Sequence, residues 1–189
     1  MRHKYPSEAI VLARSPLAEE SALLTLLTKE LGLVRARAQG VRKPGAKLSA
    51  SLQTFSEAEV VLIAGKEGWR VSGALLQEAW FPKLARSART RAGRIASLLL
   101  RLVHGESPDP HAYAIFRNCL AAFAEFPEDQ HDAIELSAAL QLLSILGLDA
   151  GELPGGAGSA FTDEALASVA KERSSYVARV NRGIAASGL

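Results

Sequence analysis

The first part of the chain carries an alternating pattern of apolar and polar positions. Between residues 7 and 77, short apolar and β-branched runs are separated by Pro, Gly or charged residues. Runs of this length, bounded by turn-forming residues, predict β-strands. The predicted strands are residues 8–13, 22–27, 33–38, 58–64 and 69–75. Segment 22–31 also fits a helix on periodicity alone, and its place among strand-like runs favours a strand.

Five strands are the number found in a small Greek-key barrel of the oligonucleotide/oligosaccharide-binding (OB) type. Tight turns are expected at residues 28–32 and 64–68, where a residue such as Gly32 adopts positive φ without strain. We therefore predict an OB-fold β-barrel over residues 1–80. Barrels of this type often bind nucleic acid.

The spacing of apolar residues becomes helical after Trp80-Phe81-Pro82. Apolar stripes, side-chain caps and terminating Gly or Pro residues predict helices at 83–104, 110–126 and 128–146, followed by a last helix that opens at Thr162. A Gly/Pro-rich linker is expected at 149–161. The predicted fold class is α+β, with an all-α domain over residues 81–189 behind the barrel.

Composition agrees with a folded domain held by its core. Of the 189 residues, 48% are hydrophobic and 22% are charged. The single cysteine, Cys119, cannot form an internal disulfide or a cysteine zinc cluster. Apolar runs stay shorter than the eighteen residues or more that a membrane span needs, and the N-terminus lacks the apolar segment of a signal peptide. We expect a cytoplasmic protein that does not bind membranes.

Charge is distributed unevenly along the chain, although the formal net charge is only +2. Residues 1–101 contain 17 Lys and Arg against 8 Asp and Glu, whereas residues 102–189 contain 5 against 12. Such asymmetry indicates that the first part meets a polyanion. Chance variation of a solvated surface is the alternative.

The first cationic cluster combines a strand and the loop that follows it. In the predicted strand 33–38, alternation places Arg35, Arg37 and Gln39 on one face. The loop adds three more cations without an intervening acid, namely Arg42, Lys43 and Lys47. This pattern is typical of phosphate binding on an OB barrel. A charged edge strand that is protected from aggregation is the alternative.

The second cationic cluster lies on the first predicted helix, again without an acid inside it. Its members are Lys83, Arg86, Arg89, Arg91, Arg94 and Arg101. A helical projection places most of them opposite the apolar stripe, on one positive wall. We expect contacts with a polyanion from Lys83, Arg86, Arg91 and Arg94, continuous with the barrel surface. The alternative is neutralisation by acids such as Glu125, Glu128 and Asp129.

Catalytic and metal-binding patterns are not found. The four histidines, His3, His104, His111 and His131, lack the spacing of metal ligands, and the sequence contains no HExxH, GxSxG or P-loop motif. Cys119 fits a buried small hydrophobe better than a nucleophile. We predict a protein that is not an enzyme and that needs no cofactor or metal.

Several segments resemble one family in order and spacing. They are Glu8-Ala9-Ile10-Val11-Leu12, residues 19–32, Gln39-Gly40-Val41-Arg42-Lys43-Pro44, Leu52-Gln53-Thr54-Phe55 and, more weakly, Leu142-Leu143-Ser144-Ile145-Leu146-Gly147-Leu148. Together they are similar to the RecO family of recombination-mediator proteins. The resemblance is specific over residues 7–78 and suggestive over 83–150.

The resemblance implies a DNA repair accessory protein of the bacterial cytoplasm, working at the nucleoid. Such proteins bind single- and double-stranded DNA without sequence specificity and anneal complementary strands. They engage the tail of single-strand-binding protein and act with RecR to load RecA. Arg35, Arg42, Lys43 and Lys47 match the basic strand and loop of the family. Many members carry a cysteine zinc cluster after the third helix, which this sequence lacks.

Two other readings remain open at the level of sequence. The barrel can be a scaffold for a protein-interaction module whose basic helix binds an acidic partner. It can also bind RNA, because OB folds accept either nucleic acid and nothing in the sequence identifies a reader of the 2′-hydroxyl.

Overall fold

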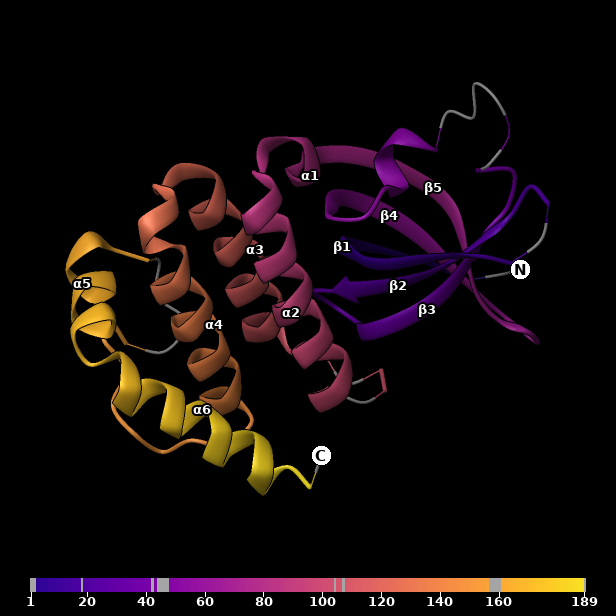
Figure 1. The fold of residues 1–189 in the computed structure, drawn as a ribbon. Helices are drawn as coiled ribbons and strands as arrows, with labels where there is room; N and C mark the ends of the chain where they lie inside the picture. Colours follow the sequence, from indigo (N-terminus) through magenta and orange to yellow (C-terminus); the bar gives the residue numbers. More distant parts are fainter. Residues whose placement is uncertain are drawn as a thin grey trace. The chain divides into compact units, whose positions relative to one another are not determined.

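The protein folds into two compact units. The fold comes from a computed structural model that describes residues 3–17, 19–41, 43, 48–103, 105–106, 108–156 and 161–188 (Figure 1). One unit, called here the barrel unit, comprises Met1–Lys83 with His104–Tyr113. The other, the helical unit, comprises Leu84–Val103 with Ala114–Leu189. The barrel unit thus includes His104–Tyr113, whereas the domain boundary predicted from the sequence assigned every residue after 80 to the helical domain.

A closed β-barrel forms the main part of the barrel unit. Its strands are β1 (Lys4–Pro16), β2 (Ala22–Thr28), β3 (Gly32–Ala38), β4 (Ser56–Gly65) and β5 (Gly68–Ala79), with a short 3-10 turn, η1 (Ala50–Leu52). They close in the order β1-β2-β3-β5-β4. The five-stranded barrel predicted from the sequence is confirmed, and segment 22–28 is a strand rather than a helix.

The barrel core follows from the two-residue period of its strands. Apolar side chains from all five strands point inward and are buried, as Val34, Ala36 and Ala38 do on β3. Neighbouring strands are antiparallel except β3 and β5, which pair in parallel only from Ala36–Trp69 to Ala38–Val71. This parallel contact is short because β3 ends at Ala38. The barrel therefore closes at a narrow point beside the β4–β5 hairpin.

Helices make up the remainder of the described chain. They are α1 (Trp80–Lys83), α2 (Arg86–Leu102), α3 (Pro110–Glu125), the 3-10 turn η2 (Glu128–Gln130), α4 (His131–Ile145), α5 (Asp163–Lys171) and α6 (Arg173–Ala186). Helix α4 is buried on almost every side and packs against α2, α5 and α6. Its nearly uniform apolar sequence explains that central position.

Two predicted helices are each divided in the structure. The helix expected over 83–104 is wrong, because Ala85 is extended, with ψ 162°, and separates α1 from α2. The single last helix is also wrong, because Glu172 leaves the helical region at φ −109°, ψ 26° between α5 and α6. Its predicted start is confirmed: the Thr162 side chain accepts a hydrogen bond from the Ala165 N–H at 3.3 Å.

Two further expectations from the sequence concern the linker and membrane-spanning segments. Residues 149–156 contain no helix or strand, as expected for the linker, while 157–160 lie outside the described residues. None of the helices in the described part of the chain has both the length and the hydropathy to span a bilayer.

Candidate nucleic-acid interface

Strand β3 presents a row of polar side chains on the outside of the barrel. Arg35, Arg37 and Gln39 are exposed, and they alternate with buried Val34, Ala36 and Ala38 as predicted. Antiparallel pairing places Arg35 opposite Thr25 of β2. Within the described residues, Arg35 forms no ion pair, so its charge faces solvent.

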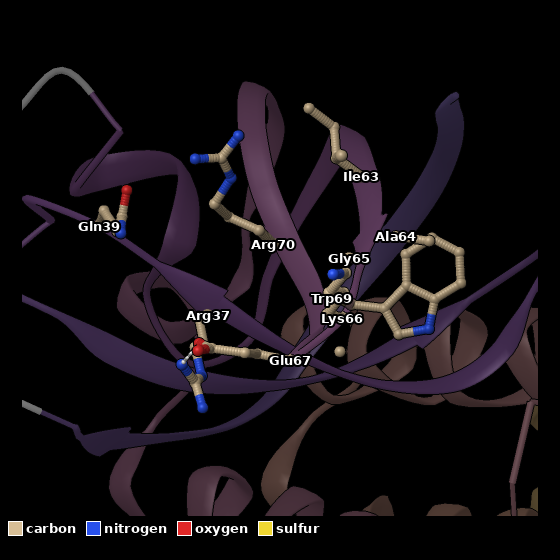
Figure 2. A pocket seen from close by; sticks show the side chains of 10 residues that line it. Arg37, Gln39, Ile63, Ala64, Gly65, Lys66, Glu67, Trp69 and Arg70 are labelled. Atoms are coloured by element: carbon tan, nitrogen blue, oxygen red, sulfur yellow. Dashed lines mark hydrogen bonds and ion pairs between the residues drawn. The ribbon is translucent and has the colours of Figure 1, made fainter. Parts of the chain in front are cut away.

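An open groove of about 840 Å³ lies beside this strand, where β3 meets the β4–β5 hairpin (Figure 2). Arg37 of β3, Gln39 directly after β3 and Arg70 of β5 line it, together with Lys66 on the hairpin turn. Arg37 and Arg70 are register partners in the parallel pair, so both side chains leave the barrel on the same face. Three cationic groups thus converge, one from β3, one from β5 and one from the turn between β4 and β5.

One carboxylate interrupts this positive groove. Glu67, beside Lys66 on the turn, accepts a hydrogen bond from Arg37 Nη1 at 2.6 Å. Both side chains are exposed, Arg37 at 46% and Glu67 at 79%. Lys66 and Arg70 form no ion pair with another described residue. The groove therefore keeps a net positive charge.

An aromatic pair lies at the edge of the same hairpin. Trp69 lines the groove and packs partly against the barrel core. The Tyr5 ring meets the Trp69 ring edge-on, with centroids 5.2 Å apart. The indole N–H of Trp69 donates to Glu106 Oε1 at 2.6 Å. Trp69 therefore combines the core role expected from the sequence with a position beside the cations.

Sequence reasoning missed Lys66, Arg70 and the place of Trp69. The alternation Trp69-Arg70-Val71 carried the signal that Arg70 points outward, since Val71 is buried. What the sequence lacked was the neighbour relation between β3 and β5. That relation brings Arg70 beside Arg37 although 33 positions separate them in the chain.

The basic loop after β3 is described only at Lys43 among its cations. The Lys43 ammonium lies 2.9 Å from Glu20, and both side chains are exposed. Arg42 and Lys47, which the sequence places in the same phosphate-binding loop, lie outside the described residues. Their role stays a prediction.

Lys83 does not lie on the same helix as the arginines grouped with it. It ends α1 and belongs to the barrel unit, whereas Arg86 begins α2 in the helical unit. Its ammonium pairs with Glu78 at 2.7 Å and lies 5.5 Å from the centroid of the Trp80 ring. The predicted positive wall running from Lys83 along one helix is therefore wrong, because Ala85 breaks the helix.

Two arginines of α2 are paired with carboxylates of α4. Glu135 accepts hydrogen bonds from Arg91 Nη1 at 2.5 Å and from Arg94 Nη2 at 2.6 Å. Asp132 lies 3.3 Å from Arg91 and 2.7 Å from Arg173 of α6. Neutralisation was an open alternative, with acids such as Glu125, Glu128 and Asp129; for Arg91 and Arg94 the acids are Asp132 and Glu135.

These pairs change the ionisation of their members. The hydrogen bond from Arg173 is the main cause that lowers the pKa of Asp132, with help from Arg91. The hydrogen bond to Glu135 raises the pKa of Arg94. Arg86 and Arg101 of α2 are exposed and form no ion pair within the described part of the chain. Among these four α2 positions, Arg86 and Arg101 are therefore the two whose charge has no carboxylate partner in the described residues, although Arg94 is also exposed, at 54%.

Groups that could support other chemistry are few in the described chain. Its His, Cys, Asp and Glu residues form no cluster of three that could hold a metal ion. Cys119 is fully buried, and burial raises the pKa of its thiol. His131 is also buried, with Nε2 3.0 Å from the Phe126 carbonyl oxygen.

Comparison with known proteins places this barrel in a family. Residues 1–75 match the family model described as recombination protein O N terminal. A DNA repair protein RecO of Heliobacterium modesticaldum is 33% identical over 144 residues, which cover 76% of this chain and 51% of that protein. The chain belongs to the RecO family. The family assignment also confirms that the barrel is of the OB type.

Other relatives match over a similar share of the chain. The DNA repair protein RecO of Bifidobacterium animalis subsp. lactis is 31% identical over 147 residues, covering 76% of this chain and 61% of the relative. That of Cyanothece sp. is 28% identical over 150 residues, covering 78% and 51%. This RecO family chain therefore spans about half to three fifths of the length of these curated relatives.

Proposed function

We propose that this RecO family chain is a DNA repair accessory protein whose barrel binds the sugar-phosphate backbone of nucleic acid. One observation carries the proposal: Arg37, Lys66 and Arg70 converge on an open groove beside the exposed Arg35. Guanidinium groups match phosphate geometry, and an open groove on an OB barrel accepts a strand without reading its bases. Binding is therefore expected to be tolerant of sequence.

The other predicted contacts are proposed with different weights. Arg42, Lys43 and Lys47 belong to the loop that leaves β3, so they are proposed to continue the phosphate path. Lys83, Arg86, Arg91 and Arg94 are proposed as secondary contacts. Three of these four are engaged with carboxylates, so a phosphate that reaches Lys83, Arg91 or Arg94 has to displace Glu78 or Glu135.

The finer role follows the family and the names of the relatives, which are DNA repair proteins. We propose binding of both single- and double-stranded DNA, annealing of complementary strands, and cooperation with RecR in loading RecA. The role is one of binding and positioning rather than catalysis. A DNA ligand places the protein at the bacterial nucleoid, in the cytoplasm.

A second groove supports a protein partner for the helical unit. It measures about 500 Å³ and has an apolar lining that includes Leu98, Leu136 and Ile184. Arg101 and Arg173 stand at its sides, together with the carboxylates already described. An acidic peptide with apolar side chains suits this lining. The tail of single-strand-binding protein is the partner that the family implies.

Salt dependence tests the proposed DNA interface. If Arg35, Arg37, Lys66 and Arg70 each meet one phosphate, single-strand affinity falls about 50-fold between 50 and 200 mM salt. Fluorescence anisotropy of a labelled oligonucleotide measures it, with two unrelated sequences to check sequence tolerance. An affinity that does not change with salt contradicts the proposal, and a preference for a matched RNA oligonucleotide favours the RNA-binding alternative.

A pair of variants with equal charge locates the interface. Replacing Arg37 and Arg70 by Ala is expected to weaken binding about 10-fold or more at 50 mM salt, because two phosphate contacts are lost. Replacing Lys171 and Arg182 by Ala removes the same charge from exposed positions of the helical unit. Equal effects of the two variants show that net charge, and not the groove, determines binding. Strand annealing with single-strand-binding protein present and absent then tests the mediator role.

A further inference from the structure

We propose that Glu67 competes with phosphate for Arg37, so that the β4–β5 hairpin sets the affinity of the groove for polyanions. The proposal rests on the proposed nucleic-acid function of the same groove. Its central observation is the hydrogen bond of 2.6 Å that Arg37 Nη1 donates to Glu67 Oε2 (Figure 2). A carboxylate of the turn thus already binds the guanidinium that is the register partner of Arg70.

The backbone explains why this carboxylate reaches β3. Gly65 and Gly68 are register partners at the end of the hairpin, so Lys66 and Glu67 form a two-residue turn. Gly68 adopts φ 92°, which a side-chain-bearing residue adopts only with strain. The tight turn places the Glu67 side chain against the neighbouring strand instead of letting it extend away from the barrel.

Electrostatics gives the competition a physical cause. Arg37 and Arg70 are like charges on adjacent positions of two paired strands, so they repel each other when no anion is present. Glu67 offsets that repulsion. A phosphate offers a guanidinium the same kind of acceptor oxygens as a carboxylate does. A phosphate that binds Arg37 through Nη1 therefore has to replace Glu67.

The exposure of the pair keeps the replacement easy. Glu67 is 79% exposed and Arg37 46% exposed, so the carboxylate regains full hydration when it leaves. Exposed ion pairs contribute little free energy. Glu67 thus lowers affinity modestly without blocking the groove. Because one carboxylate opposes one phosphate, a polyanion that reaches Arg35, Lys66 and Arg70 as well loses a smaller share of its binding free energy to this competition than a single anion does.

The test compares two neutralising substitutions on the same barrel. Glu67→Gln is expected to tighten oligonucleotide binding about 3- to 5-fold at 50 mM salt, because the exposed pair no longer competes. Glu59→Gln removes the same charge from an exposed position of β4 that does not line the groove. Its effect is expected to stay below about 2-fold, because salt screens an exposed charge that makes no contact with the ligand. Thermal unfolding of both variants should match that of the unaltered protein.

A double-substitution cycle distinguishes competition from net charge. In an Arg37→Ala background, Glu67→Gln is expected to have no further effect, since the contested cation is gone. Equal gains from Glu67→Gln and Glu59→Gln overturn the inference, and so does a Glu67→Gln gain that persists without Arg37.

Heparin separates this inference from the proposed function. If Glu67→Gln tightens binding of heparin but DNA is not bound, the competition stands and the nucleic-acid function falls. If DNA binds with the expected salt dependence and Glu67→Gln changes nothing, the function stands and the competition falls. If neither polyanion binds any variant, both are rejected.

Discussion

Two arginine pairs, Arg35/Arg37 on β3 and Arg91/Arg94 on α2, look alike in the sequence and differ in the structure. Arg91 is 25% exposed and shares Glu135, itself 17% exposed, with Arg94. Among the described residues, the β3 pair meets one carboxylate, the 79% exposed Glu67, and meets it through Arg37. The two pairs thus carry equal formal charge, and Arg94 at 54% is no less exposed than Arg37 at 46%; what differs is whether the carboxylate partner is largely buried or in water.

The difference teaches that the position of the carboxylate decides whether a cation is available. Glu135 is held by α4 between two guanidinium groups in a partly dehydrated place, where displacing it leaves charges without compensation. Glu67 stands on a turn in water, where leaving costs little. A count of basic residues therefore overestimates the helical surface and is closer to correct for the barrel.

Neutralising the carboxylate partner of each arginine pair should change the free energy of unfolding by very different amounts. Glu135→Gln leaves Arg91 partly buried with only Asp132 as an acidic partner at 3.3 Å, so we expect a loss of about 1–2 kcal/mol in the free energy of unfolding. Glu67→Gln should stay within about 0.5 kcal/mol, as exposed substitutions do. Urea unfolding followed by circular dichroism at 222 nm measures both. Similar losses in the two variants would remove the distinction between the pairs.

Removing the arginines tests the same distinction through DNA. Arg35→Ala with Arg37→Ala should weaken single-strand binding about 10-fold at 50 mM salt, because both groups are open to phosphate. Arg91→Ala with Arg94→Ala should weaken it less than about 3-fold, since Glu135 and Asp132 already engage them. Anisotropy titrations give the affinities, and circular dichroism confirms that each variant is folded. Equal losses would restore the α2 arginines as primary DNA contacts.

Acid should destabilise the helical unit through the partners of its arginines. Hydrogen bonds from Arg173 and Arg179 lower the pKa of Asp132 and Asp149, respectively. Because the folded pKa lies below the unfolded value of about 3.8, the stabilisation is complete above that value and is lost as pH falls through it toward the folded pKa. Both carboxylates belong to the helical unit.

The check is a series of urea unfolding curves between pH 7 and pH 3. Asp132→Asn together with Asp149→Asn should lower stability at pH 7 and flatten its decline toward pH 3. The Asp132 pair is expected to contribute the smaller share of this effect, because its partner Arg173 is exposed and solvent screens the interaction. The idea fails if the double variant and the unaltered protein decline in parallel.

The sequence predicted those features that depend on local periodicity. The period of two in β3 placed Arg35 and Arg37 outside and Ala36 inside, and the apolar sequence of α4 placed it centrally. The division at Ala85 and at Glu172 was missed because neither position carries a Gly or Pro that marks a break. Helix ends set by tertiary packing leave little trace in the sequence.

The candidate site was predicted only in part, because its partners are distant in sequence. The pairing of β3 with β5 brings Arg70 and Lys66 to Arg37, and the packing of α4 against α2 brings Glu135 to Arg94 across 41 positions. Periodicity tells which face a side chain occupies and does not tell what lies opposite. Both the additional cations of the barrel and the neutralising acids of α2 depend on that second relation.

The smallest expected effects come from the exposed arginines at the two ends of α2, and they test whether an arginine without a carboxylate partner binds phosphate. Arg86 is the first residue of the helix, where a cation opposes the helix dipole, and Ala85 supplies no side-chain cap. Arg86→Ala should therefore raise stability by a few tenths of a kcal/mol. The same substitution should weaken DNA binding about 2-fold if the exposed guanidinium meets a phosphate.

Arg101→Ala is the matched control, because it removes one exposed charge from the last turn of the same helix. There a cation favours the dipole, so the loss should lower stability by a similar small amount. Suppose that Arg86→Ala raises and Arg101→Ala lowers the free energy of unfolding, and that Arg86→Ala alone weakens DNA binding. The charge at the N-terminus of α2 then contributes to binding. A DNA effect of equal size at both ends would mean that the helix acts only through its net charge, and that the barrel supplies all the local contacts.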